Sequence, residues 1–241
     1  MTHVDRALIR CVLAGVLAGP LAVGASPPSS AAIVRLCSEA DGAEHCERLI
    51  EAEQMKQFPG IAVRDGGNLR LIARPGSRAV ELRNSGEPGV DPGAEFRAYA
   101  LWDYWPQRRT AVVSVTARDN DYYLLVDVER GTQTRIAAEP LLAPDGQRFV
   151  VSDLCDTQCG NVVEVWRFDS ARLIKERTFK PLEKWYEAEV KWRDAATLSL
   201  EYSVATPEPG FNAAGERILV KARPRLMKLS DWAWIDEERK R

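Results

Sequence analysis

Carboxylates are the side chains of this sequence with the clearest capacity for chemistry, because histidine is scarce. The 241 residues include only His3 and His45, and no G-x-S-x-G motif marks the nucleophile of a serine hydrolase. Glycoside hydrolysis needs only two carboxyl groups, one protonated and one ionised, flanking the scissile bond. The acidic residues on or near expected turns are Asp103, Asp119, Asp121, Asp153 and Asp156. No surrounding motif completes an active site, so the sequence assigns no catalytic residue.

Two of these acids, Asp119 and Asp121, flank Asn120 and together offer oxygen donors of the kind that bind Ca²⁺. The glycine and the terminal glutamate of a calcium loop are missing at the expected offsets. Asp and Asn also favour hairpin turns, because their side chains bond to their own backbone. The turn is the favoured interpretation, His45 is expected on a helix surface, and the sequence indicates no metal and no cofactor.

Four of the five cysteines lie outside the apolar N-terminal segment that contains Cys11. In an oxidising compartment, cysteines close in sequence usually pair, which favours Cys37–Cys46 and Cys155–Cys159 among three possible connectivities. A zinc site made of both pairs is the alternative, but C-x8-C and C-x3-C match the usual ligand spacings poorly. A redox role is also disfavoured, because such pairs are typically C-x-x-C at the start of a helix.

Residues 1–25 have the pattern of an export signal: Arg6 and Arg10 precede an uncharged run that ends in small residues. That run is short and interrupted by Gly and Pro, which disfavours a membrane span. We therefore expect cleavage, a periplasmic or extracellular protein, and no integral membrane segment afterwards. Removing two arginines and one aspartate changes the formal charge from −2 to −3. This balance does not favour binding to nucleic acid.

The elements that must position these residues are one helix and many short strands. After a linker at residues 26–42, the spacing predicts a helix over residues 43–57, capped by Asp41 with Glu44 three residues on. Short apolar strands separated by turn residues follow, so residues 43–235 are predicted to form a single β-rich domain. Residues 236–241 form a charged tail.

Turn signals recur along the β-rich region at spacings near 41, 38 and 49 residues, around the length of a four-stranded blade. The segments "EPLLAPDGQRFVVSDL" and "NVVEVWRFDSARLIKERTF" resemble blades of secreted β-propeller proteins that carry a Pro-Asp-Gly turn. The resemblance implies a mainly β fold of antiparallel meander repeats, closing as a small propeller of about four units. A β-sandwich or an open sheet is the alternative. We expect "DWAWI", at residues 231–235, to close the ring by pairing with residues 60–71.

Aromatic residues gather in "LWDYW", which holds Trp102, Tyr104 and Trp105. Flat aromatic faces suit sugar rings and peptide side chains. Because side chains alternate along a strand, Trp102 and Trp105 should point to opposite sides, which leaves one near the surface. This stretch is the predicted contact surface.

The functional hypothesis is an exported, non-enzymatic β-module that binds an envelope protein or a glycan. A propeller-type hydrolase that uses carboxylates is the alternative from another class. An inhibitor or immunity protein directed at an exported enzyme is a third hypothesis, which the sequence does not separate from the first. A propeller-like fold does not choose among them, because one fold hosts many functions.

Overall fold

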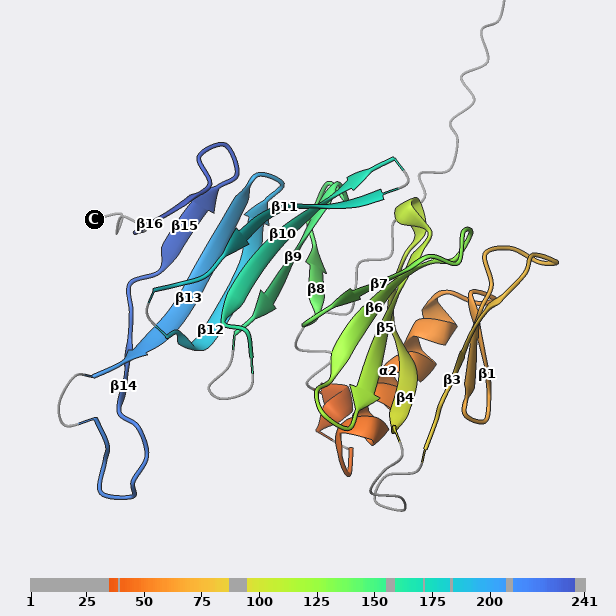
Figure 1. Cartoon of the computed structure of the whole chain (residues 1–241), viewed down its shortest axis with the longest axis horizontal. Coiled ribbons are helices and arrows are strands. Elements are labelled where there is room, and N and C mark those ends of the chain that lie inside the picture. The colour runs from red at the N-terminus through yellow and green to blue at the C-terminus, as the bar shows by residue number, and fades with distance from the viewer. Residues whose placement is uncertain are drawn as a thin grey trace, which may run out of the picture.

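Strands dominate the chain and form four antiparallel sheets, which confirms the predicted mainly β class (Figure 1). The computed structural model describes residues 35–38, 40–86, 95–154, 159–170, 172–182, 184–206 and 210–236. The export signal and most of the linker therefore lie outside the described residues. No helix in the described part of the chain is long and apolar enough to cross a membrane.

The first two sheets are plain meanders in which each strand pairs with the next. The first sheet contains β1 (Ala62–Asp65), β2 (Asn68–Leu71) and β3 (Val80–Arg83). The second sheet contains β4 (Arg97–Trp105), β5 (Thr110–Ala117), β6 (Tyr122–Asp127) and β7 (Gln133–Ile136). A short 3₁₀ helix, η1 (Pro106–Arg108), connects β4 to β5.

The third sheet repeats this pattern, whereas the fourth sheet departs from it, because its second strand pairs with both of the next two strands. The third sheet contains β8 (Pro140–Leu142), β9 (Arg148–Asp153), β10 (Val162–Asp169) and β11 (Arg172–Phe179). The fourth sheet has the order β12 (Tyr186–Asp194), β13 (Thr197–Ala205), β15 (Arg225–Lys228) and β16 (Ala233–Asp236), and β14 (Leu219–Lys221) also pairs with β13.

The Pro-Asp-Gly sequence forms the turn between β8 and β9, as its chemistry predicts. Gly146 adopts a φ of 64° and donates its N–H to the carbonyl oxygen of Ala143 at 2.8 Å. The Asp145 carboxylate accepts the N–H of Gln147 at 2.9 Å. A left-handed glycine and a self-bonding aspartate together fix the direction of this hairpin.

The second sheet buries side chains on both of its faces. Val113 belongs to an apolar cluster shared with Leu69 and Leu71 of the first sheet. Its neighbour Val112 belongs to a second cluster, shared with Phe149 of the third sheet. Because successive residues of a strand point to opposite faces, the run "AVVSV" contributes to two cores at once.

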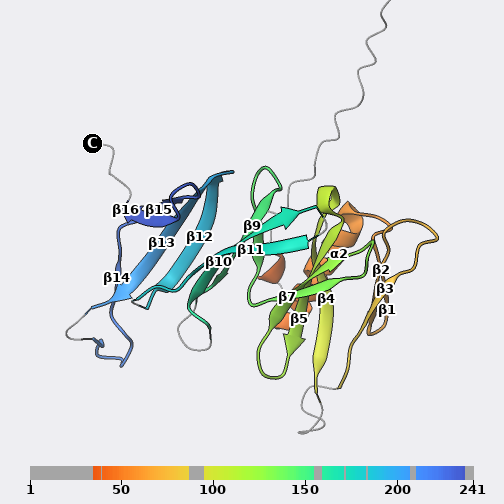
Figure 2. The same cartoon turned by 45° about the horizontal axis from the view of Figure 1, so that its top comes forward.

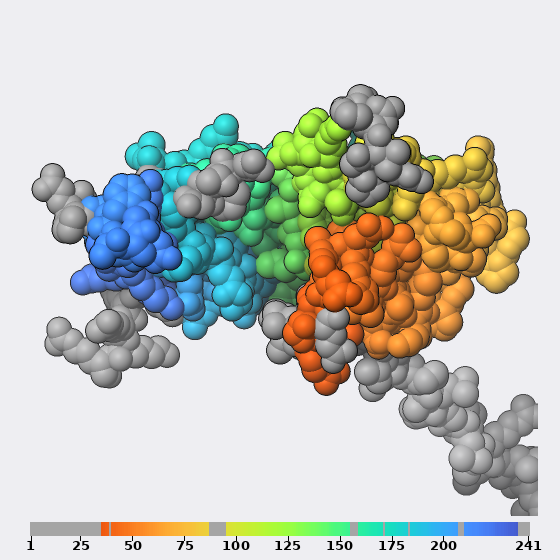
Figure 3. Space-filling view, turned by 90° about the horizontal axis from the view of Figure 1, so that it is seen from below, coloured from red at the N-terminus to blue at the C-terminus, as the bar shows by residue number. Residues whose placement is uncertain are grey.

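The third sheet is buried in the same way. Phe149 packs toward the second sheet, whereas Val150 lies in a cluster with Leu198 and Trp185 of the fourth-sheet region. The four sheets thus follow one another in sequence order, face to face. Figures 2 and 3 show this row from two further directions, running from the first sheet to the blue C-terminal strands.

The two outer faces of the row are charged. On the first sheet, Val63, Arg70 and Glu81 lie opposite one another, and Arg70 forms an ion pair with Glu81 at 3.6 Å. On the fourth sheet, Lys191 pairs with Glu189 at 2.7 Å, and a similar pair links two further strands. Charged outer faces allow the first and fourth sheets to contact water, as the polar faces of capping repeats do in repeat proteins.

The predicted closure of the chain by its tail is wrong. β16 pairs with β15, with Ile235 opposite Leu226, while β1 pairs with β2. The first and last sheets lie at opposite ends of the row (Figure 1). β15 and β16 are joined by a short turn in which the backbone N–H of Trp232 donates to the carbonyl oxygen of Lys228. A local hairpin closes a far shorter loop than joining the chain ends, so its entropic cost is lower.

The N-terminal helix is confirmed as α2 (Ala43–Gln57), but its predicted cap is wrong. Gly42 is the N-cap residue, and no side chain caps the helix. Asp41 lies one residue too early, and its backbone N–H contacts Nδ1 of His45 at 3.2 Å. Within the described residues, the Cys37–Cys46 disulfide is present and ties the incoming segment to the helix.

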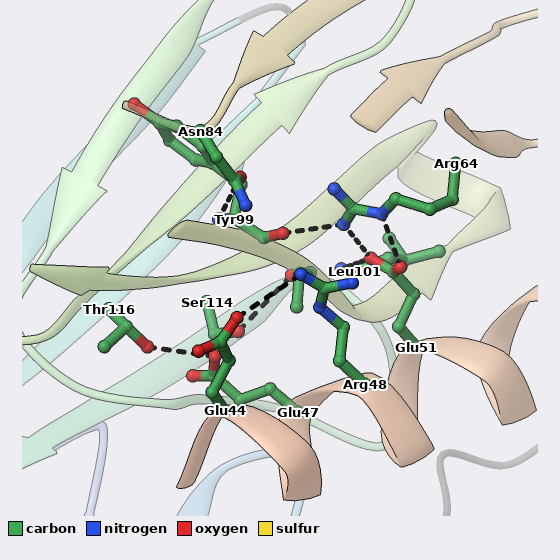
Figure 4. A network of polar contacts seen from close by, with 11 residues as sticks. Glu44, Glu47, Arg48, Glu51, Arg64, Asn84, Tyr99, Leu101, Ser114 and Thr116 are labelled. Carbon is green, nitrogen blue, oxygen red and sulfur yellow. Dashed lines mark hydrogen bonds and ion pairs between the residues drawn. The ribbon is translucent and has the colours of Figure 1, made fainter. Parts of the chain in front are cut away.

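A buried ion pair joins α2 to the first and second sheets (Figure 4). The carboxylate of Glu51 binds the guanidinium of Arg64 on β1 and accepts the N–H of Leu101 at 2.9 Å. Arg64 also donates to the carbonyl oxygen of Tyr99 at 2.6 Å. The carboxylate of Glu51 and the guanidinium of Arg64 thus provide hydrogen-bond partners for two backbone groups of β4. Nearby, burial raises the pKa of Glu47, whose carboxylate accepts a bond from Thr116.

Replacing Glu51 with leucine should lower the free energy of unfolding by about 3 to 5 kcal/mol, because Arg64 would remain buried without its partner. Chemical denaturation of the variant measures this loss. Glu53→Gln on the same helix is the matched control, since its pair with Lys56 is exposed and should contribute less than about 1 kcal/mol. Equal stability of both variants would contradict a structural role for the buried pair.

Ending the chain after Ser230 should lower the free energy of unfolding by about 3 kcal/mol or more, because β16 and two packed indoles are lost. Trp234 lies edge-on to Trp185 at 6.3 Å, and Trp232 packs against Phe179. A chain ending at Asp236 retains β16 and serves as the control. Thermal and urea melts that coincide for the two truncated chains would show that this hairpin adds no stability.

Candidate functional site

The segment "LWDYW" lies on β4, and a bulge changes where its side chains point. The register of β4 against β5 shifts between Leu101 and Asp103. As a result, Trp102 and Trp105 both pack toward the third sheet, and the expectation that they point to opposite sides is wrong. Tyr104 packs toward the first sheet, edge-on to Phe58 at 5.3 Å. An extra residue in a strand resets its alternation, which the sequence pattern does not reveal.

Burial differs among the three aromatic residues. Tyr104 and Trp105 are 7% and 3% exposed, so neither presents a face to solvent. Trp102 is half-buried, packs edge-on against Tyr123 at 5.5 Å, and donates its indole N–H to Glu139 at 2.9 Å. Of the three, Trp102 keeps the most accessible surface, and the others contribute to the cores between sheets.

Asp103 sits at the bulge as a largely desolvated carboxylate. It accepts the backbone N–H of Tyr104 at 2.7 Å and the indole N–H of Trp105 at 2.8 Å. Burial raises the pKa of Asp103 to about 6, although both hydrogen bonds oppose this rise. The charge of Glu139 adds to the rise, so the two carboxylates influence each other.

Glu139 connects the second sheet to the segment that begins the third. It directly precedes β8, and burial raises its pKa although the indole of Trp102 donates to it. Burial also raises the pKa of Tyr123, with Glu139 as a secondary cause. A similar contact joins the third and fourth sheets, where Trp192 on β12 donates its indole N–H to the carbonyl oxygen of Leu141 on β8. Trp102 therefore links β4 to the segment before β8, and Trp192 links β12 to β8.

The remaining candidate acids serve turns or lie elsewhere. Asp121 accepts the N–H of Ala117, and Asp153 accepts the N–H of Gly160 at 2.7 Å. Asp156 and Cys155 lie outside the described residues; Cys159 is disulfide-bonded. Across the described ranges, no three His, Cys, Asp or Glu side chains are arranged to hold a metal ion.

An arginine-lined cleft, here called the first cleft, opens between the second and third sheets. Its volume is about 520 Å³. η1 and the β10–β11 hairpin lie side by side in Figures 1 and 2, and residues of both line the cleft. Its charged lining consists of Arg108, Arg109, Arg130, Arg172, Asp127 and Glu129. Neither Asp103 nor Glu139 lines it.

Three of these arginines are held in place by the protein. Arg108 donates to the carbonyl oxygen of Gly146 at 2.7 Å and lies 4.8 Å from the ring centre of Phe168. Arg109 binds Glu129, and Arg130 binds Asp127. Arg172 is exposed and has no side-chain partner among the described residues. One guanidinium is therefore available to an external anion.

A second cleft, of about 620 Å³, lies beside the first sheet. It shares Glu129 and Arg130 with the first cleft and adds Arg70 and Arg78. Arg70 is paired with Glu81, whereas exposed Arg78 has no side-chain partner in the described part of the chain. Six arginines and three carboxylates line the two clefts, an excess of three positive charges in a chain of formal charge −2.

The sequence contains a signal for these clefts, but it is dispersed. Arg108 and Arg109 follow a proline at one expected turn, and Arg130 lies in "ERG" at another. The net charge conceals them, because acidic residues elsewhere outnumber the basic ones. The meander of the second sheet brings these two turns together, where Arg109 binds Glu129 and its carbonyl oxygen accepts the backbone N–H of Val128.

No protein-family model matches the sequence, and no curated protein matches it. A crystal structure of a protein from Lactobacillus plantarum is similar over 71% of this chain and 64% of that chain, with 13% sequence identity and a TM-score of 0.28. The matched region thus spans slightly less than two thirds of that protein. A likeness of this degree carries no argument about fold or function.

The buried carboxyl of Asp103 should make the stability of the protein depend on pH. Its folded-state pKa of about 6 lies above its ordinary value of 3.8, so the folded protein holds this proton more tightly than the unfolded chain does. The resulting stability is full below the ordinary value and is lost as the pH rises through about 6. The Asp103→Asn variant lacks this titration.

Urea denaturation of both proteins at several pH values measures the effect. The free energy of unfolding of the unchanged protein, minus that of Asp103→Asn, should fall by about 3 kcal/mol between about pH 3.5 and about pH 7. Contributions from titrating groups that do not interact with Asp103 cancel in this difference, whereas that of Glu139, whose charge acts on Asp103, does not. A difference that stays constant with pH would mean that Asp103 ionises as an ordinary solvated aspartate.

Proposed function

We propose that this chain is an exported, non-enzymatic binding module that holds an anionic component of the cell envelope, a glycan or a protein, at its arginine-lined clefts. The observation that carries the proposal is the presence in each cleft of an exposed guanidinium, Arg172 or Arg78, without a partner among the described residues. Arginine is well suited to this task, because its planar fork binds carboxylate and phosphate oxygens in pairs.

The fold and the cysteines support the two other parts of this proposal. Antiparallel sheets of three to five strands that follow one another face to face are similar to the arrangement of propeller blades, so we interpret the chain as an open, propeller-like row. Disulfides form and persist in oxidising compartments, which supports a periplasmic or extracellular location.

A carboxylate-dependent hydrolase is the second candidate, and the raised pKa of Asp103 favours it. A general acid requires a carboxyl that stays protonated near the working pH, and desolvation provides one here. However, Asp103 and Glu139 both accept hydrogen bonds from indoles that pack between sheets, and neither lines the two clefts. The environment of Asp103 and Glu139 therefore favours a role in holding the sheets together over a role in binding a substrate.

The inhibitor or immunity hypothesis uses the same surface. An acidic patch on an exported enzyme would be one form of the anionic protein considered above, and electrostatic complementarity would speed its association. Such a partner requires no further feature of the chain.

Replacing Arg172 with alanine should weaken binding to acidic glycans by about tenfold, because a charge-assisted contact is lost. Binding of the purified protein to immobilised oligogalacturonate and heparin, with neutral dextran alongside, measures this at low and physiological salt. Arg223→Ala is the matched control, since Arg223 is an exposed arginine between β14 and β15.

The proposal expects retention on the acidic glycans alone, weaker retention in salt, and normal behaviour of the control variant. Equal retention on dextran, or no retention together with cleavage of a glycoside that depends on Asp103, would contradict a binding function and favour the hydrolase.

A further inference from the structure

We propose that the two clefts form one continuous site for a linear, repeatedly charged glycan, which crosses the turn between β6 and β7. This inference rests on the proposed function and deepens it, because it specifies the shape and chemical class of the ligand. It starts from the fact that Glu129 and Arg130, both in that turn, line the two clefts together.

The turn between the clefts is held firmly by its own hydrogen bonds. The carboxylate of Asp127 accepts the backbone N–H groups of Glu129 and Arg130, each at 2.9 Å. Gly131 adopts a φ of 71° and donates its N–H to the carbonyl oxygen of Asp127 at 2.7 Å. A turn fixed in this way sets a constant separation between the charges on its two sides, which suits a ligand whose charges repeat.

The unpartnered arginines mark the two ends of this path. Arg172 lies in the first cleft on β11, and Arg78 lies in the second cleft just before β3. Between them stands Arg130, whose exposed pair with Asp127 contributes little free energy and can be exchanged for a ligand anion. Three positive side chains placed one after another along this path suit a ligand with regularly spaced negative charges better than a single small anion.

The rest of the lining favours a glycan over an acidic peptide. The first cleft adds hydroxyl and amide groups suited to sugar hydroxyls: Gln107, Thr132, Thr134 and Ser170. Of its three apolar residues, Leu125 is 2% exposed and Phe168 is covered by Arg108, which leaves half-buried Leu173 as the one apolar side chain offered to a peptide. A peptide needs pockets for alternate side chains to be bound selectively.

A length series tests the inference. Isothermal titration of the full-length protein with galacturonic acid and with its oligomers of increasing length measures the affinity at fixed salt. The monomer should bind weakly, and the affinity should rise by about a hundredfold or more once the oligomer spans both clefts, because the second contact becomes intramolecular.

Variants on either side of the turn separate the possible outcomes. Arg78→Ala and Arg172→Ala should each reduce the affinity for the long oligomer by about tenfold or more. Arg78→Ala should leave the binding of short oligomers in the first cleft unchanged. Arg223→Ala should behave as the unchanged protein. Arg78 and Arg172 have no side-chain partner within the part of the chain that the structure describes, so thermal melts of all three variants should coincide.

Failure of the inference and failure of the proposed function give different results. Binding of acidic oligomers with an affinity independent of length, and no effect of Arg78→Ala, would leave the binding module intact but overturn the continuous site. Polyglutamate of matched length bound more tightly than the oligogalacturonate would overturn the glycan class. No binding of any acidic chain would overturn both.

Discussion

Burial of both faces of the second and third sheets is the constraint on which the rest of this structure depends. Val112 and Val113 are neighbours on β5 and lie in different cores, as do Phe149 and Val150 on β9. A sheet of this kind requires an apolar neighbour on each side, so the four sheets must form a row. The row can stop only where an outer face tolerates water, and the ion pairs on the first and fourth sheets provide such faces.

Features set by local chemistry could be predicted from the sequence. The Pro-Asp-Gly turn, the helix over residues 43–57 and the Cys37–Cys46 disulfide each depend on residues close together in the chain. The failures involve pairing choices that the residues leave open. The bulge beside Asp103 sends both Trp102 and Trp105 to the same side, and "DWAWI" pairs with its own hairpin instead of the distant first strands.

The row of sheets also explains why the sequence did not predict the clefts. The arginines lie on several separate turns and strands, where a charged residue alone indicates only solvent exposure. The meander of the second sheet places the β6–β7 turn next to η1, and face-to-face packing adds the β10–β11 hairpin, so that dispersed charges line shared clefts. The buried carboxylates Asp103 and Glu139 belong to the joints between sheets, where indoles bond to them. The carboxylates that join the sheets are thus separate from the charges that line the two clefts.

Two-dimensional NMR during titration with a long oligogalacturonate tests the proposed binding surface most directly. It follows the signals of the backbone amides and of the arginine Nε–H groups. We expect shifts at Arg78, at Arg108 to Thr110, at Asp127 to Thr134 and at Arg172, on both sides of one turn. Signals of the charged outer face of the fourth sheet should stay unchanged. Shifts confined to Trp102 and its neighbours, or spread over the fourth sheet, would contradict the claim that the arginine-lined clefts are the binding surface.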